Sequence, residues 1–320
     1  PRSTLFPYTT LFRSTAKGVV TSSNWLDAGP VLGDVLVVCT TASIEFYSRS
    51  SPIQLFHVVS PLEETPATTN STFSRQCARG AAVVFGDSGA TPSVLVGTCT
   101  GVVHSFQLVP SAPRSGSVSP TVAGSTKWQT PCSAITCVAS APGGRSIPFV
   151  GMLDCSGASW AVADDAGTVC VYGNPCTRVA LLAACGSPCT GIAFHPSCAA
   201  IVASFASGHV RIFSIDSNSV SIEISAHARP VTALHVHPTL PLAITTSEDS
   251  WIRCWSLNAT SVSNPQPQQH PTTITVRQAF AASLPSPAMW TGAQFIDSGS
   301  TVSMSVAAFD VSSMYIFNQS

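Results

Sequence analysis

Three residues with side chains suited to acid–base or nucleophilic chemistry, His227, Thr245 and Asp249, lie in one short stretch of the chain. A histidine can act as a general base, a threonine hydroxyl as a nucleophile, and an aspartate as the group that orients the histidine. Trp255 follows shortly after them, and catalysis offers it no role. A hydrogen-bonded structural role accounts for all four residues. We therefore expect them to stabilise the fold, and we expect no enzyme activity from them.

The elements that must position these residues are short β-strands. Residues 231–237 alternate in side-chain character with a period of two, 242–244 form a short apolar run, and 252–255 form a third run. Turn-forming residues separate the three runs. Alternation of this kind is typical of strands with one face buried, so residues 226–257 are predicted to form strand, turn, strand, turn and strand.

The same pattern recurs along the chain. His195 and His237, each followed by a proline, lie 42 residues apart, and Tyr172 and Phe213, at the ends of equivalent strands, lie 41 apart. Such a regular period indicates a repeat architecture in which each unit buries its faces against its neighbours. Six units are recognisable, centred on residues 35–47, 94–106, 160–172, 189–213, 226–257 and 292–317.

The unit at residues 226–257 resembles the WD-repeat family, whose repeats run about 40 to 45 residues with paired signals near their start and end. The resemblance implies an all-β fold, a WD-repeat β-propeller. It also implies that His227, Thr245, Asp249 and Trp255 form a structural tetrad, in which the histidine meets the aspartate carboxylate and the threonine and tryptophan complete the network. The other units keep the strands but lose these four residues.

The N-terminus departs from this pattern. The chain begins with proline, its first methionine is Met152, and residues 1–14, PRSTLFPYTTLFRS, resemble translated sequencing adapter. We expect residues 1–14 to be a non-native artefact and residues 15–320 to form one propeller. Six recognisable blades of an expected seven follow, with the first blade missing or incomplete. Polar, proline-rich stretches at about 111–125 and 261–273 are predicted to be flexible insertions.

Composition excludes several classes of partner. Lys and Arg number 14 against 15 Asp and Glu, for a net charge of −1, so no basic surface exists to collect phosphates and nucleic-acid binding is not expected. The longest apolar runs fall well short of the roughly 20 residues that a membrane-spanning helix needs. Many of the 12 cysteines lie in apolar runs, where cysteine behaves as a small buried hydrophobe. Reduced thiols and a cytoplasmic location are therefore expected.

The histidines and cysteines do not predict a metal site, and we expect no cofactor. His235 and His237 project on the same face of one strand, but few carboxylates lie nearby to complete a metal site. The cysteines also lack zinc-finger spacing.

The family resemblance implies a non-enzymatic scaffold or adaptor that presents one propeller face to other proteins. In this arrangement the turns of the unit at 226–257 bring Arg229, Glu248 and Ser250 to that face, where they are the candidate partner-binding residues. The alternatives are a structural subunit of a large cytoplasmic or ciliary assembly and, third, a propeller hydrolase. The oligomeric state is left open.

Overall fold

The computed structural model describes residues 19–49, 53–59, 77–85, 91–111, 120–141, 158–173, 177–197, 200–261, 272–283, 289–298, 301–309 and 314–318. Within these ranges every regular element is a β-strand, as the alternating sequence pattern predicts. The strands form six antiparallel sheets in chain order, each built from strands that are consecutive in the sequence. Consecutive pairing explains why each sequence repeat forms one structural unit.

The first three sheets, or blades, have four strands each. Blade 1 contains β1 (Val20–Asp27), β2 (Asp34–Thr40), β3 (Ile44–Ser48) and β4 (Gln54–Val59). Blade 2 contains β5 (Ala78–Phe85), β6 (Pro92–Thr98), β7 (Val102–Pro110) and β8 (Pro120–Gln129). Blade 3 contains β9 (Ile135–Ser140), β10 (Ala158–Asp164), β11 (Val169–Gly173) and β12 (Arg178–Leu182).

The last three blades follow the same order, but in the final one the described residues form three strands. Blade 4 contains β13 (Cys189–Phe194), β14 (Ala200–Phe205), β15 (His209–Ser214) and β16 (Ser219–Ser225). Blade 5 contains β17 (Val231–Val236), β18 (Leu242–Ser247), β19 (Trp251–Ser261) and β20 (Thr272–Ser283). Blade 6 contains β21 (Trp290–Ser298), β22 (Thr301–Ala308) and β23 (Met314–Asn318).

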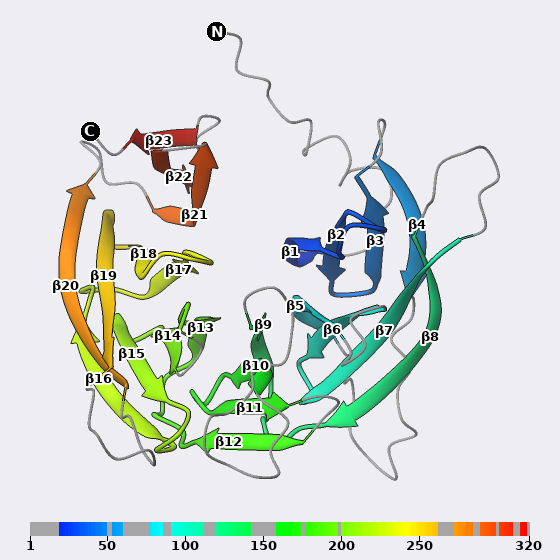
Figure 1. Cartoon of the computed structure of the whole chain (residues 1–320), viewed down its shortest axis with the longest axis horizontal. Coiled ribbons are helices and arrows are strands. Elements are labelled where there is room, and N and C mark those ends of the chain that lie inside the picture. Colours follow the sequence, from blue (N-terminus) through cyan, green and yellow to red (C-terminus); the bar gives the residue numbers. More distant parts are fainter. Residues whose placement is uncertain are drawn as a thin grey trace, which may run out of the picture.

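The blades stand around a common centre, with the first strand of each innermost (Figure 1). These strands lie against one another in chain order, β1 with β5, then β9, β13, β17 and β21. Blades 1 and 6 form the two ends of the arc in Figure 1, and the arc is open between them. The predicted β-propeller class and the six recognisable units are confirmed.

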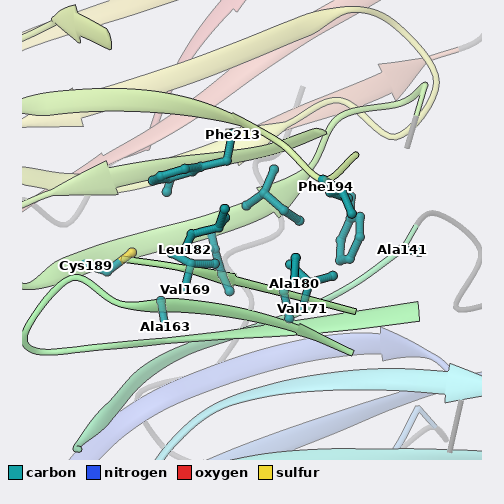
Figure 2. Close-up of a cluster of buried hydrophobic side chains, with 14 of the residues drawn as sticks. Ala141, Ala163, Val169, Val171, Ala180, Leu182, Cys189, Phe194 and Phe213 are labelled. Atoms are coloured by element: carbon teal, nitrogen blue, oxygen red, sulfur yellow. The ribbon is translucent and has the colours of Figure 1, made fainter. Parts of the chain in front are cut away.

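The core consists of apolar layers between neighbouring blades. The layer between blades 3 and 4 buries Val171 and Leu182 from one side against Phe194 and Phe213 from the other, as Figure 2 shows. Burying one such side chain contributes roughly 1.5–3 kcal/mol. Because each layer needs residues from two blades, no blade can be stable alone.

The predicted insertions are only partly loops. In place of a loop up to residue 125, β8 begins at Pro120 and pairs with β7 along its whole length. Likewise, Ser261 ends β19 and pairs with Thr272 at the start of β20. Outer strands gain their stability from backbone pairing and expose much of their surface, so polar and proline-rich composition does not exclude them. Residues 112–119 and 262–271, and the adapter-like residues 1–14, lie outside the described ranges.

Each innermost strand has an irregularity in its pairing one or two residues after its start. An extra residue of this kind bends the strand and re-aims its side chain. In blade 3 the residue is Thr136, whose hydroxyl donates to the carbonyl of Cys189 in blade 4 at 2.7 Å. In blade 1 the Thr21 hydroxyl donates to the carbonyl of Ala78 in blade 2. In blades 1 and 3 the irregular position therefore contacts the next blade. The irregular positions are Thr21, Gly80, Thr136, Thr190, Thr232 and Thr291.

Candidate functional site

The four residues of the predicted tetrad, His227, Thr245, Asp249 and Trp255, form one continuous hydrogen-bonded chain inside blade 5. The indole N–H of Trp255 donates to the hydroxyl of Thr245 at 2.9 Å. That hydroxyl lies 2.9 Å from Nε2 of His227, and Nδ1 of His227 lies 3.1 Å from both carboxylate oxygens of Asp249. Trp255 and Thr245 lie on adjacent strands, while His227 precedes β17 and Asp249 follows β18. The chain of bonds therefore ties two loops to the interior of the sheet.

The bonding pattern selects one protonation state. The Thr245 oxygen accepts from Trp255, so its own proton is free to donate to Nε2 of His227, and the ring then carries its proton on Nδ1, facing Asp249. Burial lowers the pKa of His227 below its ordinary value, against the opposing effect of Asp249. The imidazole is therefore neutral, and every polar group in the chain has a partner.

Asp249 is held as a carboxylate by the loops it joins. It accepts from the backbone N–H of Trp251 at 3.0 Å and from that of Ala228 at 3.1 Å. Partial burial raises the pKa of Asp249, but the N–H of Trp251, the histidine and the N–H of Ala228 outweigh burial and lower it below its ordinary value. These contacts fix the loop at residues 226–230 against the turn at residues 248–250. No group of the tetrad is left over for a substrate.

The loop and turn of blade 5 belong to a surface that all six blades build in the same way. In each blade, the residue before the innermost strand accepts a backbone hydrogen bond from the residue after the second strand, at 2.7 to 3.2 Å. We call this surface the loop face. Its six bonds run from Thr41 to Val19, Cys99 to Cys77, Asp165 to Ala134, Ala206 to Pro188, Glu248 to Pro230 and Phe309 to Met289.

The turns of the loop face also join one blade to the next. The carbonyl of Gly101 in blade 2 accepts from the N–H of Thr130, which precedes blade 3, at 3.0 Å. In the same way the carbonyl of Gly208 in blade 4 accepts from the N–H of His227 at 2.9 Å. The position of the blade 5 loop is therefore fixed from both sides, by its own turn and by that of blade 4.

The predicted partner-binding residues lie together on this face. Arg229 and Glu248 are exposed, and Ser250 is half-buried. The carbonyl of Arg229 accepts from the Ser247 hydroxyl at 3.1 Å, so the backbone is held while the guanidinium extends from it. Ser250 has a φ of 67°, and its carbonyl accepts from the indole N–H of Trp290 in blade 6 at 2.8 Å. Ser250 thus connects two blades through its backbone.

Sequence reasoning missed an aromatic neighbour of these residues. Trp251, directly after Ser250, is 39% exposed, and the guanidinium of Arg253 lies 5.3 Å from its ring centroid. An exposed tryptophan with a stacked cation is a feature of protein-binding surfaces. The sequence does contain a signal for this exposure. Trp251 is the first residue of its strand, directly after the turn, and a residue at that position need not be buried.

The two histidines considered as metal ligands, His235 and His237, both accept hydrogen bonds from the backbone. Nδ1 of His235 accepts from the N–H of Phe295 in blade 6 at 3.3 Å, and Nδ1 of His237 accepts from the N–H of Leu240 at 3.0 Å. Among the described residues, no group of three or more His, Cys, Asp or Glu side chains is arranged to hold a metal ion. Nor does any helix within those ranges have the length and apolar character to span a membrane.

Comparison with known proteins places this architecture in a family. The model of the WDR54 family matches residues 18–320. WD repeat-containing protein 54 of Mus musculus is 27% identical over 180 residues, which cover 52% of this chain and 45% of the relative. WD repeat domain 54 of Rattus norvegicus is 26% identical over 101 residues, which cover 32% of this chain and 30% of the relative. The matched stretches thus span less than half of either relative.

Solved structures share the fold at low sequence identity. The β-propeller domain of Cps50 (Swd1) from Myceliophteria thermophila has a TM-score of 0.61 at 11% identity, covering 95% of this chain and 83% of that one. A chain of a humanized mutant of the Chaetomium thermophilum Polycomb Repressive Complex 2 has a TM-score of 0.62 at 11% identity, covering 94% of this chain and 67% of that one. The fold, the repeats and the match over nearly the whole length agree: the chain belongs to the WDR54 family of WD-repeat β-propeller proteins.

Proposed function

We propose that this protein is a non-enzymatic scaffold or adaptor that binds other proteins through the blade 5 part of the loop face. The observation that carries the proposal is the exposed pair Arg229 and Glu248 on loops that the buried tetrad holds rigid. A fixed backbone lowers the entropy lost when a partner binds. Arginine and tryptophan are the residues most enriched among those that dominate binding energy, and Trp251 lies beside the pair.

Two further observations support a binding role over catalysis. The tetrad uses its polar groups on one another, so its histidine and threonine are not available as base and nucleophile. The structural neighbour from Polycomb Repressive Complex 2 is part of a multi-protein complex, as is common for WD-repeat propellers. A cytoplasmic location, expected from the reduced cysteines, belongs to the same proposal, and fractionation of cells expressing a tagged chain tests it.

The test is quantitative affinity capture with a charge-reversal variant. Arg229→Glu is expected to reduce recovery of one or more specific partners at least tenfold, because a charge reversal turns a favourable electrostatic contact of the guanidinium into a repulsive one. Arg277→Glu is the matched control: it makes the same substitution on the exposed outer strand β20 of the same blade. An unchanged set of partners with Arg229→Glu and with Glu248→Lys would remove this surface from consideration.

A further inference from the structure

Blade 2 differs from the other blades at the repeated position of the loop face. The six residue pairs joined there by the backbone hydrogen bond carry varied side chains, and blade 2 alone places a cysteine on both sides, Cys77 and Cys99. Cys77 stands immediately before β5, and Cys99 immediately after β6. The two thiols therefore occupy the place where blade 5 has Pro230 and Glu248.

The backbone geometry brings the two thiols into range of one another. The N–H of Cys99 donates to the carbonyl of Cys77 at 3.0 Å, which continues the register of Ala78 with Thr98. Residues opposite each other at such a hydrogen-bonded position have α-carbons about 5.5 Å apart, inside the range that a disulfide spans. The N–H of Cys77 also lies 3.1 Å from Sγ of Cys99, which places that sulfur over its neighbour.

Exposure distinguishes this pair from the close thiols of Cys132 and Cys170. Sγ of Cys132 lies 3.5 Å from Sγ of Cys170, but these residues are only 3% and 0% exposed, so an oxidant in solution does not reach them. Cys77 and Cys99 are both half-buried and lie on a loop surface. Burial and the neighbouring Cys99 raise the pKa of Cys77, and the positive charge of Arg79 acts in the opposite direction.

We propose that Cys77 and Cys99 form a reversible disulfide when the protein meets a hydroperoxide. The thiolate of one cysteine attacks the peroxide, which releases one molecule of water or alcohol and leaves a sulfenic acid. The second thiol then attacks that sulfur, forming the S–S bond and releasing water. The two sulfurs together lose two electrons and two protons, and the O–O bond takes them up. A dithiol reductant reverses the step by exchange.

The disulfide would link the two segments of blade 2 that lie on the loop face. It joins the segment before β5 to the turn between β6 and β7. His227 and Asp249 join the two equivalent segments of blade 5. The inference does not rest on the proposed binding function, because it concerns blade 2 and is read out as a covalent bond.

The experiment treats the purified full chain with hydrogen peroxide and maps disulfides by mass spectrometry without reduction. The expected result is a linked Cys77–Cys99 peptide that disappears with dithiothreitol, formed before any link that involves Cys132 or Cys170. Cys99→Ser abolishes the linked peptide. Cys185→Ser, the matched control at another half-buried thiol, retains it. Oxidation is also expected to raise the Tm by a few degrees, because the cross-link restricts the unfolded chain.

Two results would overturn the inference. One is that Cys77 and Cys99 both remain reduced at peroxide concentrations that oxidise other cysteines. The other is that each pairs with a different cysteine. Because the linked peptide is sought in the unmodified protein, a Cys99→Ser variant that fails to fold leaves the test intact.

Discussion

His227 shows how a residue suited to catalysis is committed to structure. Its two nitrogens are satisfied by Thr245 and Asp249, and the indole of Trp255 completes the chain of bonds. The geometry needs a neutral imidazole, and burial supplies it by lowering the pKa. A catalytic base requires a free lone pair that faces a substrate, and this ring has none to offer.

Removing the hydroxyl at the centre of the network tests this role. Thr245→Val keeps the shape of the side chain but leaves the indole N–H of Trp255 and Nε2 of His227 buried without partners. We expect a loss of about 2–4 kcal/mol in the free energy of unfolding, measured by urea denaturation. Thr275→Val, at an exposed threonine of β20, is the control and should cost less than about 0.5 kcal/mol. Equal losses in both variants would argue against a stabilising network.

Histidine burial also predicts a pH dependence. Burial, with a smaller effect of His237, lowers the pKa of His235 to about 4. The unfolded state therefore binds a proton near the ordinary histidine pKa of about 6.5, while the folded state does not until about pH 4. Stability contributed by the neutral ring is present above pH 6.5 and declines as the pH falls towards 4.

The variant His235→Asn isolates this effect. Its carbonyl oxygen can accept from the N–H of Phe295 in place of Nδ1, and it does not titrate. Urea denaturation at pH 7 and at pH 4.5 should show a smaller loss for the variant than for the unmodified chain. The other buried histidines leave a residual slope in both proteins. If both proteins lose the same stability, His235 is not responsible.

At the scale of the element, the turns of the loop face in blades 2 to 5 share one backbone conformation. Gly101, Gly167 and Gly208 have φ of 78°, 82° and 83° at equivalent positions in blades 2 to 4, and blade 5 places Ser250 there at 67°. The left-handed conformation closes the turn between the second and third strands. Glycine is also needed for space, because a β-carbon at Gly208 would lie 2.2 Å from the carbonyl oxygen of His227.

Two alanine substitutions separate the cost of the left-handed backbone conformation from the cost of a steric clash. Gly186→Ala should cost roughly 1–2 kcal/mol in the free energy of unfolding, because its φ is 74° and a β-carbon there meets nothing within 4 Å. Gly208→Ala carries the same conformational cost together with the clash against blade 5, and should cost about 3 kcal/mol or more. Chemical denaturation of the two variants gives the comparison. A Gly208→Ala variant as stable as Gly186→Ala would show that the blade 5 loop moves away freely.

At the scale of the whole molecule, the described residues of blade 6 form one strand fewer than those of the other blades. Blade 6 ends at β23, and among the described residues this strand pairs with β22 alone. Its Met314 and Ile316 are 65% and 62% exposed. An apolar strand with unpaired backbone groups is a template for pairing with another chain.

Self-association is the expected consequence. Light scattering after size-exclusion chromatography should show a mass that increases with protein concentration, and Ile316→Lys should shift the distribution towards the monomer. Val220→Lys is the control, on the outer strand β16, where the native valine is 46% exposed. If Ile316→Lys and Val220→Lys associate to the same extent as the unmodified chain, β23 is not the contact.

The sequence by itself determined the repeat, its period and the apolar strands of every blade. These follow from local alternation, because a strand with a buried face must repeat every second residue. The family resemblance added the pairing of the tetrad. Composition was a poor guide to the outer strands: β8 and β20 begin within stretches that resemble loops, since backbone pairing on an exposed edge places little demand on side chains.

Only the tertiary structure decided how distant loops meet. The backbone bond from Cys99 to Cys77 spans 22 residues along the chain, and the bond from His227 to the Gly208 carbonyl joins two blades. Neither backbone bond can be predicted from a local sequence pattern. Strand pairing and blade packing bring the bonded groups together, and the residue types do not. For the exposed pair Arg229 and Glu248, the repeat predicted the surface on which they lie. The backbone bonds from His227 to Gly208 and from Glu248 to Pro230 fix the loops that carry them.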